Sequence, residues 1–169
     1  MRQKQYFLYG IGIFVMVLID QISKLMAIRY LKGQSNFLII KDILELEYLE
    51  NRGAAFGSFD GKRIFLVLFT VLLTLLIAYR LICLPIEKRY TGMKICLVAV
   101  ISGALGNLLD RVFRGYVVDF IYFVPINFPK FNIADSYIVV ALISLMLLLF
   151  TYYHENETEF LLSLKKRIK

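Results

Sequence analysis

The sequence contains no tryptophan, one histidine and two cysteines among 169 residues. With His154 as its single histidine and no cysteine cluster, the chain lacks the ligand set of a zinc site, so we expect no metal ion and no other cofactor. Cys83 and Cys96 lie within apolar stretches, which argues against a disulfide framework and predicts that both pack as small hydrophobic side chains. Any hydrolytic chemistry in this chain is therefore predicted to be independent of metal.

Charge is never concentrated into a run typical of nucleic-acid binding. The chain carries 20 lysine and arginine residues against 13 acidic ones, for a formal net charge of +7. The basic residues flank apolar segments and are not interleaved with aromatic side chains, so we expect no nucleic-acid partner. One basic cluster near the C-terminus is predicted to contact anionic membrane lipids instead. It consists of Lys165, Lys166, Arg167 and Lys169.

Long apolar stretches make up most of the sequence. Hydrophobic residues account for 59% of the chain and its mean hydropathy is +0.68, beyond the usual make-up of globular proteins. They gather at about 6–30, 64–84, 93–112 and 133–153, and each stretch matches the roughly 20 helical residues that cross a bilayer. The sequence predicts a membrane α-helical fold with four transmembrane helices, as a single membrane domain over residues 1–169.

Two features of the ends bear on topology. Arg2 and Lys4 precede the first apolar stretch, as in a secretory signal peptide, but no small-x-small cleavage site follows, so we expect a retained helix. Four spans place both termini on one side of the membrane. Ten of the 20 basic residues then lie on that side and ten on the other, so the positive-inside rule gives a tie. Several of the second ten lie within motifs described below, and discounting them favours cytoplasmic termini.

The segment at about 31–63 is the only sizeable region predicted outside the membrane. Within it, Leu44, Leu46 and Tyr48 alternate with Glu45, Glu47 and Leu49. This period of two predicts a strand with one apolar face. The strand is followed by NRGAAFG at 51–57, whose small residues permit close approach of the backbone. We expect a small extracytoplasmic, β-containing region that rests on the membrane surface.

Two aspartates near the spans have basic partners in the sequence. Lys24 lies four residues after Asp20, which places the two on one helix face as an ion pair. Asp110 is followed by Arg111 and, four residues on, by Arg114. A carboxylate held by such partners stays charged and is a poor proton shuttle, so both aspartates are predicted to have a structural role.

Asp119 and Asp135 differ, because neither has a basic residue three or four positions away. If these two carboxylates converge in an apolar setting, their mutual repulsion leaves one protonated and one ionised near neutral pH. Such a pair suits peptide hydrolysis, since one member activates a water and the other protonates the scissile carbonyl. The same residues are equally compatible with two unrelated aspartates that cap helices or orient loops, and Asp135 lies where the first turn of a helix favours an anion.

Four motifs together resemble those of the bacterial lipoprotein signal peptidases, also called signal peptidase II. They are DQISK at 20–24, NRGAAFG at 51–57, GALGNLLDRVFRGYVVDF at 103–120 and FNIADS at 131–136. Each motif is weak alone, but all four in order on a chain with four predicted spans are specific. The resemblance implies an aspartic endopeptidase that removes the signal peptide from diacylglyceryl-modified prolipoproteins and cleaves before the lipid-modified cysteine.

The resemblance also implies residue roles and a location. Asp119 and Asp135 become the catalytic pair, at the extracytoplasmic face of the bacterial cytoplasmic (inner) membrane, with both termini in the cytoplasm. The residues implied to bind substrate or to organise the site are Asn51, Gly53, Asn107, Arg111, Asn132, Asp20, Lys24 and Asp110. The implied partners are prolipoprotein substrates and membrane lipids, and we expect a monomer. We also hypothesise that the NRGAAFG segment covers the bound peptide as a lid.

Two other functions are compatible with a pair of membrane aspartates. The first is another intramembrane protease, although Asp119 and Asp135 lie outside the YD and GxGD contexts of presenilin-like enzymes. The second is a channel or proton-coupled carrier that uses the four aspartates as a relay. The carrier hypothesis predicts transport without cleavage, and four short spans leave little room for alternating access.

Overall fold

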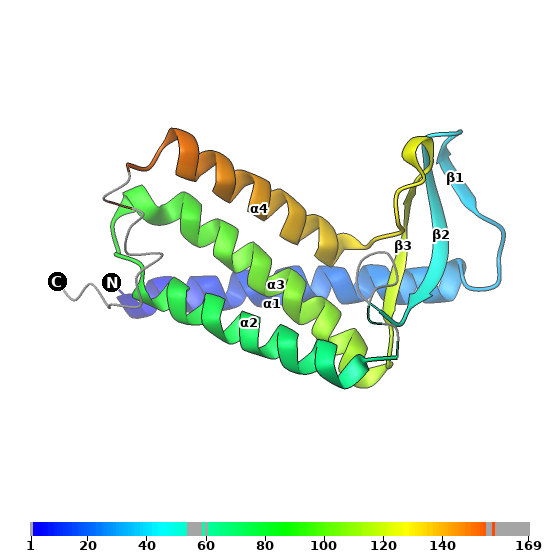
Figure 1. Ribbon diagram of the computed structural model, residues 1–169, viewed down its shortest axis with the longest axis horizontal. Coiled ribbons are helices and arrows are strands. Elements are labelled where there is room, and N and C mark those ends of the chain that lie inside the picture. Colours follow the sequence, from blue (N-terminus) through cyan, green and yellow to red (C-terminus); the bar gives the residue numbers. More distant parts are fainter. Residues whose placement is uncertain (1, 54–58, 60, 155–156, 158–169) are drawn as a thin grey trace.

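The computed structural model describes residues 2–53, 59, 61–154 and 157, and contains four long helices (Figure 1). These are α1 (Arg2–Tyr30), α2 (Arg63–Cys83), α3 (Thr91–Phe113) and α4 (Ile133–Thr151). All four are long and apolar enough to cross a membrane, which confirms the four predicted spans. Both cysteines are free, Cys96 buried and Cys83 half-buried, so they pack as predicted.

The helix ends differ from the predicted ones by a few residues, for local reasons. Helix α2 ends at Cys83 because Leu84 takes an extended conformation before Pro85. The short 3-10 helix η2 (Lys88–Tyr90) then leads into α3. Helix α4 stops at Thr151, and the chain turns back so that the ring of Tyr153 stacks on that of Tyr90 at 5.7 Å.

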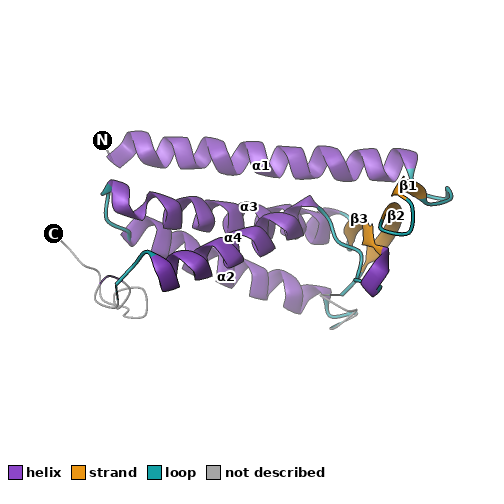
Figure 2. Cartoon of the chain, turned by 90° about the horizontal axis from the view of Figure 1, so that it is seen from above, coloured by secondary structure: helices purple, strands orange, loops and turns teal. Residues whose placement is uncertain are grey.

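Helix α3 is the centre of the bundle and packs against α1, α2 and α4. More than half of its most apolar part is buried, against less than a fifth for each of the other three helices. Figure 2 shows α1 running along the whole bundle beside α3. The outer helix faces expose large apolar side chains such as Phe14, Leu68 and Leu147, as expected where lipid is the solvent.

Two glycines bring α3 close to Asp20 of α1 and to Ala134 at the start of α4. A Cβ atom at Gly106 would lie 2.5 Å from Asp20 Oδ2 and 3.3 Å from Ala134 Cβ. At Gly103 it would overlap the backbone carbonyl oxygen of Ala134. Because the contacts are this close, α3 draws α1 and the start of α4 together.

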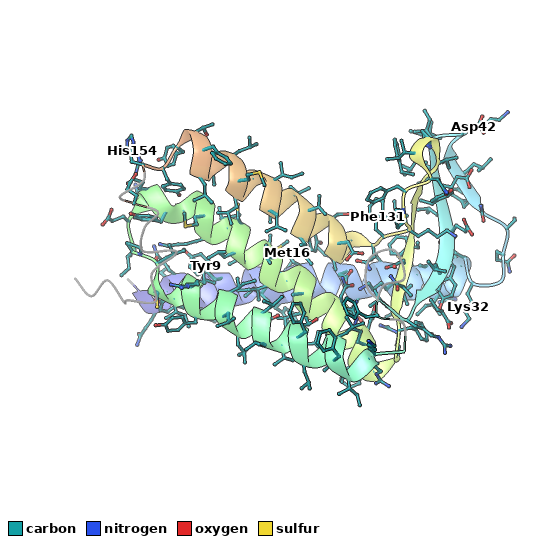
Figure 3. All side chains as sticks on the ribbon, viewed as in Figure 1. Tyr9, Met16, Lys32, Asp42, Phe131 and His154 are labelled. Carbon is teal, nitrogen blue, oxygen red and sulfur yellow. The ribbon has the colours of Figure 1, made fainter. Side chains whose placement is uncertain are left out.

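A three-stranded antiparallel sheet lies at the end of the bundle opposite the start of α1 (Figure 1). Its strands are β1 (Phe37–Ile40), β2 (Leu44–Asn51) and β3 (Val117–Phe123), in that spatial order. The predicted strand is β2, and its apolar face is confirmed at Leu46 and Tyr48, which pack with Ala27 of α1 and Val118 of β3. The tip of the β1–β2 hairpin carries Asp42 and projects beyond the helices (Figure 3).

The location predicted for the sheet was incomplete, because β3 comes from outside the 31–63 segment. After α3, Gly115 has a φ of 86°, a conformation that glycine adopts without strain, and the chain reverses there. The following residues, VVDFIYF, are β-branched and aromatic except for Asp119. Strand β3 pairs with β2 so that Asp119 lies opposite Leu49. The short helix η3 (Val124–Ile126) follows, and the chain then returns towards α4.

Candidate active site

Asp119 and Asp135 are brought together by the link between β3 and α4. Phe131 forms an antiparallel bridge with Ile121 of β3, in which each donates a backbone N–H to the other, at 2.9 and 3.0 Å. Figure 3 shows Phe131 where the helices meet the sheet. Only one residue separates Phe131 from α4, so the first turn of that helix lies beside the strand that carries Asp119.

Asp135 belongs to a capping box at the start of α4. The Asn132 side chain accepts a hydrogen bond from the Asp135 backbone N–H at 3.0 Å, and Asp135 Oδ2 accepts one from the Asn132 backbone N–H at 3.1 Å. An anion in the first turn is favoured by the helix dipole. The capping position considered from the sequence is therefore confirmed, and it leaves Asp135 Oδ1 facing the interior of the site.

Three asparagines surround the two carboxyl groups. Asn132 Nδ2 donates to Asp119 Oδ1 at 2.7 Å, and Asn51 Nδ2 donates to Asp119 Oδ2 at 2.8 Å. Asn107 Nδ2 donates to Asp135 Oδ1 at 2.7 Å, while Asn107 Oδ1 accepts from Asn132 Nδ2 at 3.1 Å. The two carboxyl groups therefore belong to one hydrogen-bond network, with Asn132 in contact with both.

The setting of Asp119 changes its acidity. Burial, followed by the negative charge of Asp135, raises the pKa of Asp119 from 3.8 to about 7. The hydrogen bonds from Asn51 and Asn132 and the charge of Lys24 act in the opposite direction but are smaller effects. An acid with a pKa near 7 exchanges a proton readily at neutral pH, as a general acid must.

Asp20 and Asp110 form a buried ion-pair cluster with Lys24. Lys24 Nζ lies 2.9 Å from Asp20 Oδ2 and 3.0 Å from Asp110 Oδ2, and all three side chains are fully buried. Asp110 is also paired with Arg114. The predicted partners Lys24 and Arg114 are confirmed. The prediction that Arg111 clamps Asp110 was wrong, because its guanidinium donates to the Gly53 carbonyl oxygen at 3.2 Å instead.

The cluster also fixes the backbone that carries the candidate dyad. Asp20 Oδ1 accepts a hydrogen bond from the backbone N–H of Ala134 at 3.0 Å, and Asp110 Oδ2 accepts one from that of Val118 at 3.2 Å. Each of these residues immediately precedes a member of the dyad. Among the described residues, no group of three or more His, Cys, Asp or Glu side chains is arranged to hold a metal ion.

A cavity of about 490 Å³ opens beside the two carboxyl groups. Its polar wall is formed by both aspartates and by Asn51, Asn107 and Arg111, and its apolar wall includes Val139 and Val140 of α4. The two valines are 53% and 63% exposed on the outside of the bundle, so the cavity reaches the surface that faces lipid. A second cavity of about 520 Å³ lies between β2, β3 and the 127–130 segment. The two cavities share Asn51, Phe128, Pro129 and Lys130.

Known proteins with similar sequences and structures place the chain in a family. Residues 12–151 match the family described as Signal peptidase (SPase) II. The lipoprotein signal peptidase of Clostridium novyi (strain NT) is 44% identical over 136 residues, which cover 79% of this chain and 90% of that protein. The lipoprotein signal peptidase of Clostridioides difficile (strain 630) is 35% identical over 151 residues, covering 89% and 99%. A solved structure described as a bacterial membrane enzyme, at 2.3 Å resolution, has a TM-score of 0.75 and 28% identity, with coverage of 95% and 94%.

The chain belongs to the signal peptidase II family. It is therefore an enzyme, a multi-pass membrane peptidase that cleaves signal peptides. The resemblance drawn from four sequence motifs is confirmed, and the family rules out a carrier as the main function.

In this signal peptidase II, hydrogen bonds and ion pairs join all ten of the predicted site residues into one continuous network. The sequence reasoning missed Gln21, whose side chain donates to Asp20, Asp110 and the Gly106 carbonyl oxygen. Its position inside the DQISK motif was the available signal. It also missed Lys130, whose ammonium lies 2.6 Å from Glu47 Oε1 at the junction of the two cavities. The lid hypothesis concerns the NRGAAFG segment at 51–57, and it stays untested because 54–57 lie outside the described residues.

Proposed function

We propose that this signal peptidase II is an intramembrane aspartic endopeptidase with Asp119 and Asp135 as its catalytic dyad. It removes the signal peptide from diacylglyceryl-modified prolipoproteins by cutting the bond before the lipid-modified cysteine. The observation that carries the proposal is the asparagine network, which holds two carboxyl groups together beside a cavity that reaches lipid. One group ionised and one protonated is the state that such a pair adopts near neutral pH.

The chemistry requires only this pair and a water molecule. The ionised carboxylate takes a proton from the water as its oxygen attacks the scissile carbonyl carbon, and the protonated carboxyl donates its proton to the carbonyl oxygen. In the collapse of the resulting diol, the carboxyl that took the proton from water gives it to the leaving nitrogen, which becomes the α-amino group of the lipidated cysteine as the C–N bond breaks. The other carboxylate takes a proton from a diol hydroxyl, which becomes the new carbonyl, so each aspartate returns to its starting protonation state.

The two cavities suggest how such a substrate lies. The acyl chains and the end of the signal peptide occupy the cavity walled by Val139 and Val140, next to lipid. Arg111 and the asparagines bind the extended peptide backbone, since guanidinium and amide groups supply donors and acceptors in a dry setting. The mature chain leaves through the second cavity, which the first meets at Asn51 and Lys130.

We further propose that the site lies at the outer face of the bacterial cytoplasmic membrane, with both chain ends in the cytoplasm. The sheet, whose strand β3 carries Asp119, and the start of α4, which carries Asp135, lie at the end of the bundle opposite the start of α1 (Figure 1), as this orientation requires. We propose that the enzyme works as a monomer, because every residue of the network comes from one chain.

A cleavage assay tests the substrate. The purified protein is incubated with a diacylglyceryl-modified prolipoprotein and with its unmodified form, and loss of the signal peptide is followed by gel mobility and mass spectrometry. We expect cleavage of the modified form, with the new N-terminus at the lipidated cysteine. Equal cleavage of both forms would defeat the substrate proposal, and cleavage of neither would defeat the proposed activity.

Substitution of the dyad tests the mechanism. Asp119→Asn and Asp135→Asn keep the side-chain size but remove the ability to carry the reacting proton, so each is expected to lower turnover by at least about 1,000-fold. Asp42→Asn is the matched control, because Asp42 lies at the exposed tip of the hairpin. Substantial residual turnover in either folded dyad variant would remove that residue from the catalytic pair.

A further inference from the structure

The amide oxygens of the three asparagines around the dyad are each held by a group that only donates hydrogen bonds. Asn51 Oδ1 accepts from the backbone N–H of Gly53 at 3.0 Å, and Asn132 Oδ1 accepts from that of Asp135 at 3.0 Å. Asn107 Oδ1 accepts from the ammonium of Lys24 at 2.9 Å. A backbone N–H and an ammonium have no acceptor, so each amide has one allowed orientation.

The orientation of the three amides determines which of their atoms face the carboxyl groups of Asp119 and Asp135. With every oxygen turned away, all three NH2 groups face the carboxyl groups, and both oxygens of Asp119 and Asp135 Oδ1 accept from them. No asparagine oxygen is then free to accept a hydrogen bond from the protonated carboxyl. Because both aspartates line the cavity, the dyad proton is left to hydrogen-bond to the other carboxyl group or to a group in the cavity.

Lys24 differs from the two backbone donors because it is a side chain and can be replaced. It is fully buried and contributes little net charge to the site, since Asp20 and Asp110 both lie within 3.0 Å of its ammonium. Arg114 balances the second of these acids. The charge of Lys24 has only a small effect on the pKa of Asp119, and the hydrogen-bonded link from Lys24 to the dyad runs through Asn107.

We propose that Lys24 is a positioning residue, which orients the Asn107 amide so that Asp135 is held as the ionised member of the dyad and Asp119 keeps the proton. Asp119 accepts two amide hydrogen bonds, from Asn51 and Asn132. Asp135 accepts one from the Asn107 amide and one from a backbone N–H at the positive end of the α4 dipole, and this position at the helix start is what favours the anion at Asp135. In the reaction, Asp135 takes the proton from water and Asp119 gives its proton to the carbonyl oxygen. This inference rests on the proposed aspartic mechanism.

The test is a double-mutant cycle between Lys24 and Asn107. Removal of Lys24 alone would leave Asp20 buried and unpaired, so the cycle is built on an Asp20→Asn reference. The reference is compared with versions that add Lys24→Met, Asn107→Leu, or both. Each single addition is expected to lower kcat on the order of 10- to 100-fold, as expected for the loss of a hydrogen bond to a charged group. KM should stay within about threefold after Lys24→Met, because Lys24 does not line the cavity.

Because Lys24 acts through Asn107, the two losses are expected not to add. The kcat of the version with both additions should lie no more than about threefold below the kcat of the less active single addition. Losses that multiply, or an unchanged kcat after Lys24→Met, would overturn the inference. Lys24→Gln on the same reference restores an N–H donor without a charge, and should recover most of the kcat lost with methionine. A folded Gln version as inactive as the Met version would also overturn the inference.

Lys94→Met is the matched control for folding. Lys94 is a second buried lysine, on α3 and 13 residues before Asn107, which is roughly 20 Å along the helix. We expect its loss to leave kcat within about twofold and to change only the thermal midpoint. If Asp119→Asn and Asp135→Asn are inactive but the losses in the cycle add, only the role of Lys24 is refuted. If the aspartate variants are active, the mechanism on which that role rests is refuted.

Discussion

The four aspartates near the spans are the same residue type in two kinds of environment. Asp20 and Asp110 are ion-paired with Lys24, whereas Asp119 and Asp135 are hydrogen-bonded by neutral amides and, among the described residues, form no direct ion pair. Sequence spacing predicted this separation, because the ion pairs are partly local and follow the helical repeat. It could not predict the asparagine network, whose members come from β2, α3 and the start of α4.

The raised pKa of Asp119 predicts a basic limit to activity. Its carboxyl keeps its proton below about pH 7 and loses it above. As the proton donor to the carbonyl oxygen, it is therefore active on the acid side of that value. We expect kcat to fall about tenfold for each pH unit well above the apparent value, which belongs to the coupled pair.

The measurement is kcat with saturating lipidated substrate between about pH 5 and pH 9, with the thermal midpoint followed in the same buffers. The fall in kcat should occur while the thermal midpoint shows the enzyme to be folded. A kcat that stays constant up to about pH 9 would contradict the assignment of the proton to Asp119.

Elements differed in how far the sequence determined them. The four spans follow from length and hydropathy alone, which are local properties. Strand β3 does not, because VVDFIYF is as apolar as a continuation of α3, and only the turn at Gly115 and pairing with β2 make it a strand. The candidate site depends on this non-local pairing, since Asp119 is carried by β3.

Close packing of α3 predicts the effect of adding one methyl group. Gly106→Ala places a Cβ atom 2.5 Å from Asp20 Oδ2, in a buried cluster that has no room to yield. Overpacking of this kind costs about 1–3 kcal/mol, so we expect the thermal midpoint to fall by roughly 5 °C. Turnover should fall as well, because Asp20 holds the backbone N–H of Ala134.

Gly10→Ala is the control for this substitution. Gly10 is also within a helix, but a Cβ atom there would meet no other atom within 4 Å, and alanine favours the helix. The thermal midpoint should stay the same or rise slightly. Equal effects of the two substitutions would show that packing at Gly106 does not govern the position of α1 against α3.

On the scale of the whole molecule, the structure explains why counting basic residues gave a tie. Several basic residues at the sheet end are held by specific partners. Lys24 and Arg114 belong to the buried cluster, Lys130 pairs with Glu47, and Arg63 donates to the backbone carbonyls of Arg111 and Val112 at the end of α3. Such residues are retained for structure and report little on which side faces the cytoplasm, so discounting them was physically justified.

The proposed orientation predicts a labelling pattern for the two ends of the molecule. Asp42 lies at the tip of the hairpin and His154 beyond the end of α4, at opposite ends of the structure (Figure 3). Single cysteines are introduced at these positions after Cys83 and Cys96 have been replaced by alanine. In intact cells, a membrane-impermeant maleimide should label Asp42→Cys at once and His154→Cys only after the membrane has been permeabilised. The reverse pattern would place the dyad on the cytoplasmic side, where a secreted prolipoprotein does not present its cleavage site.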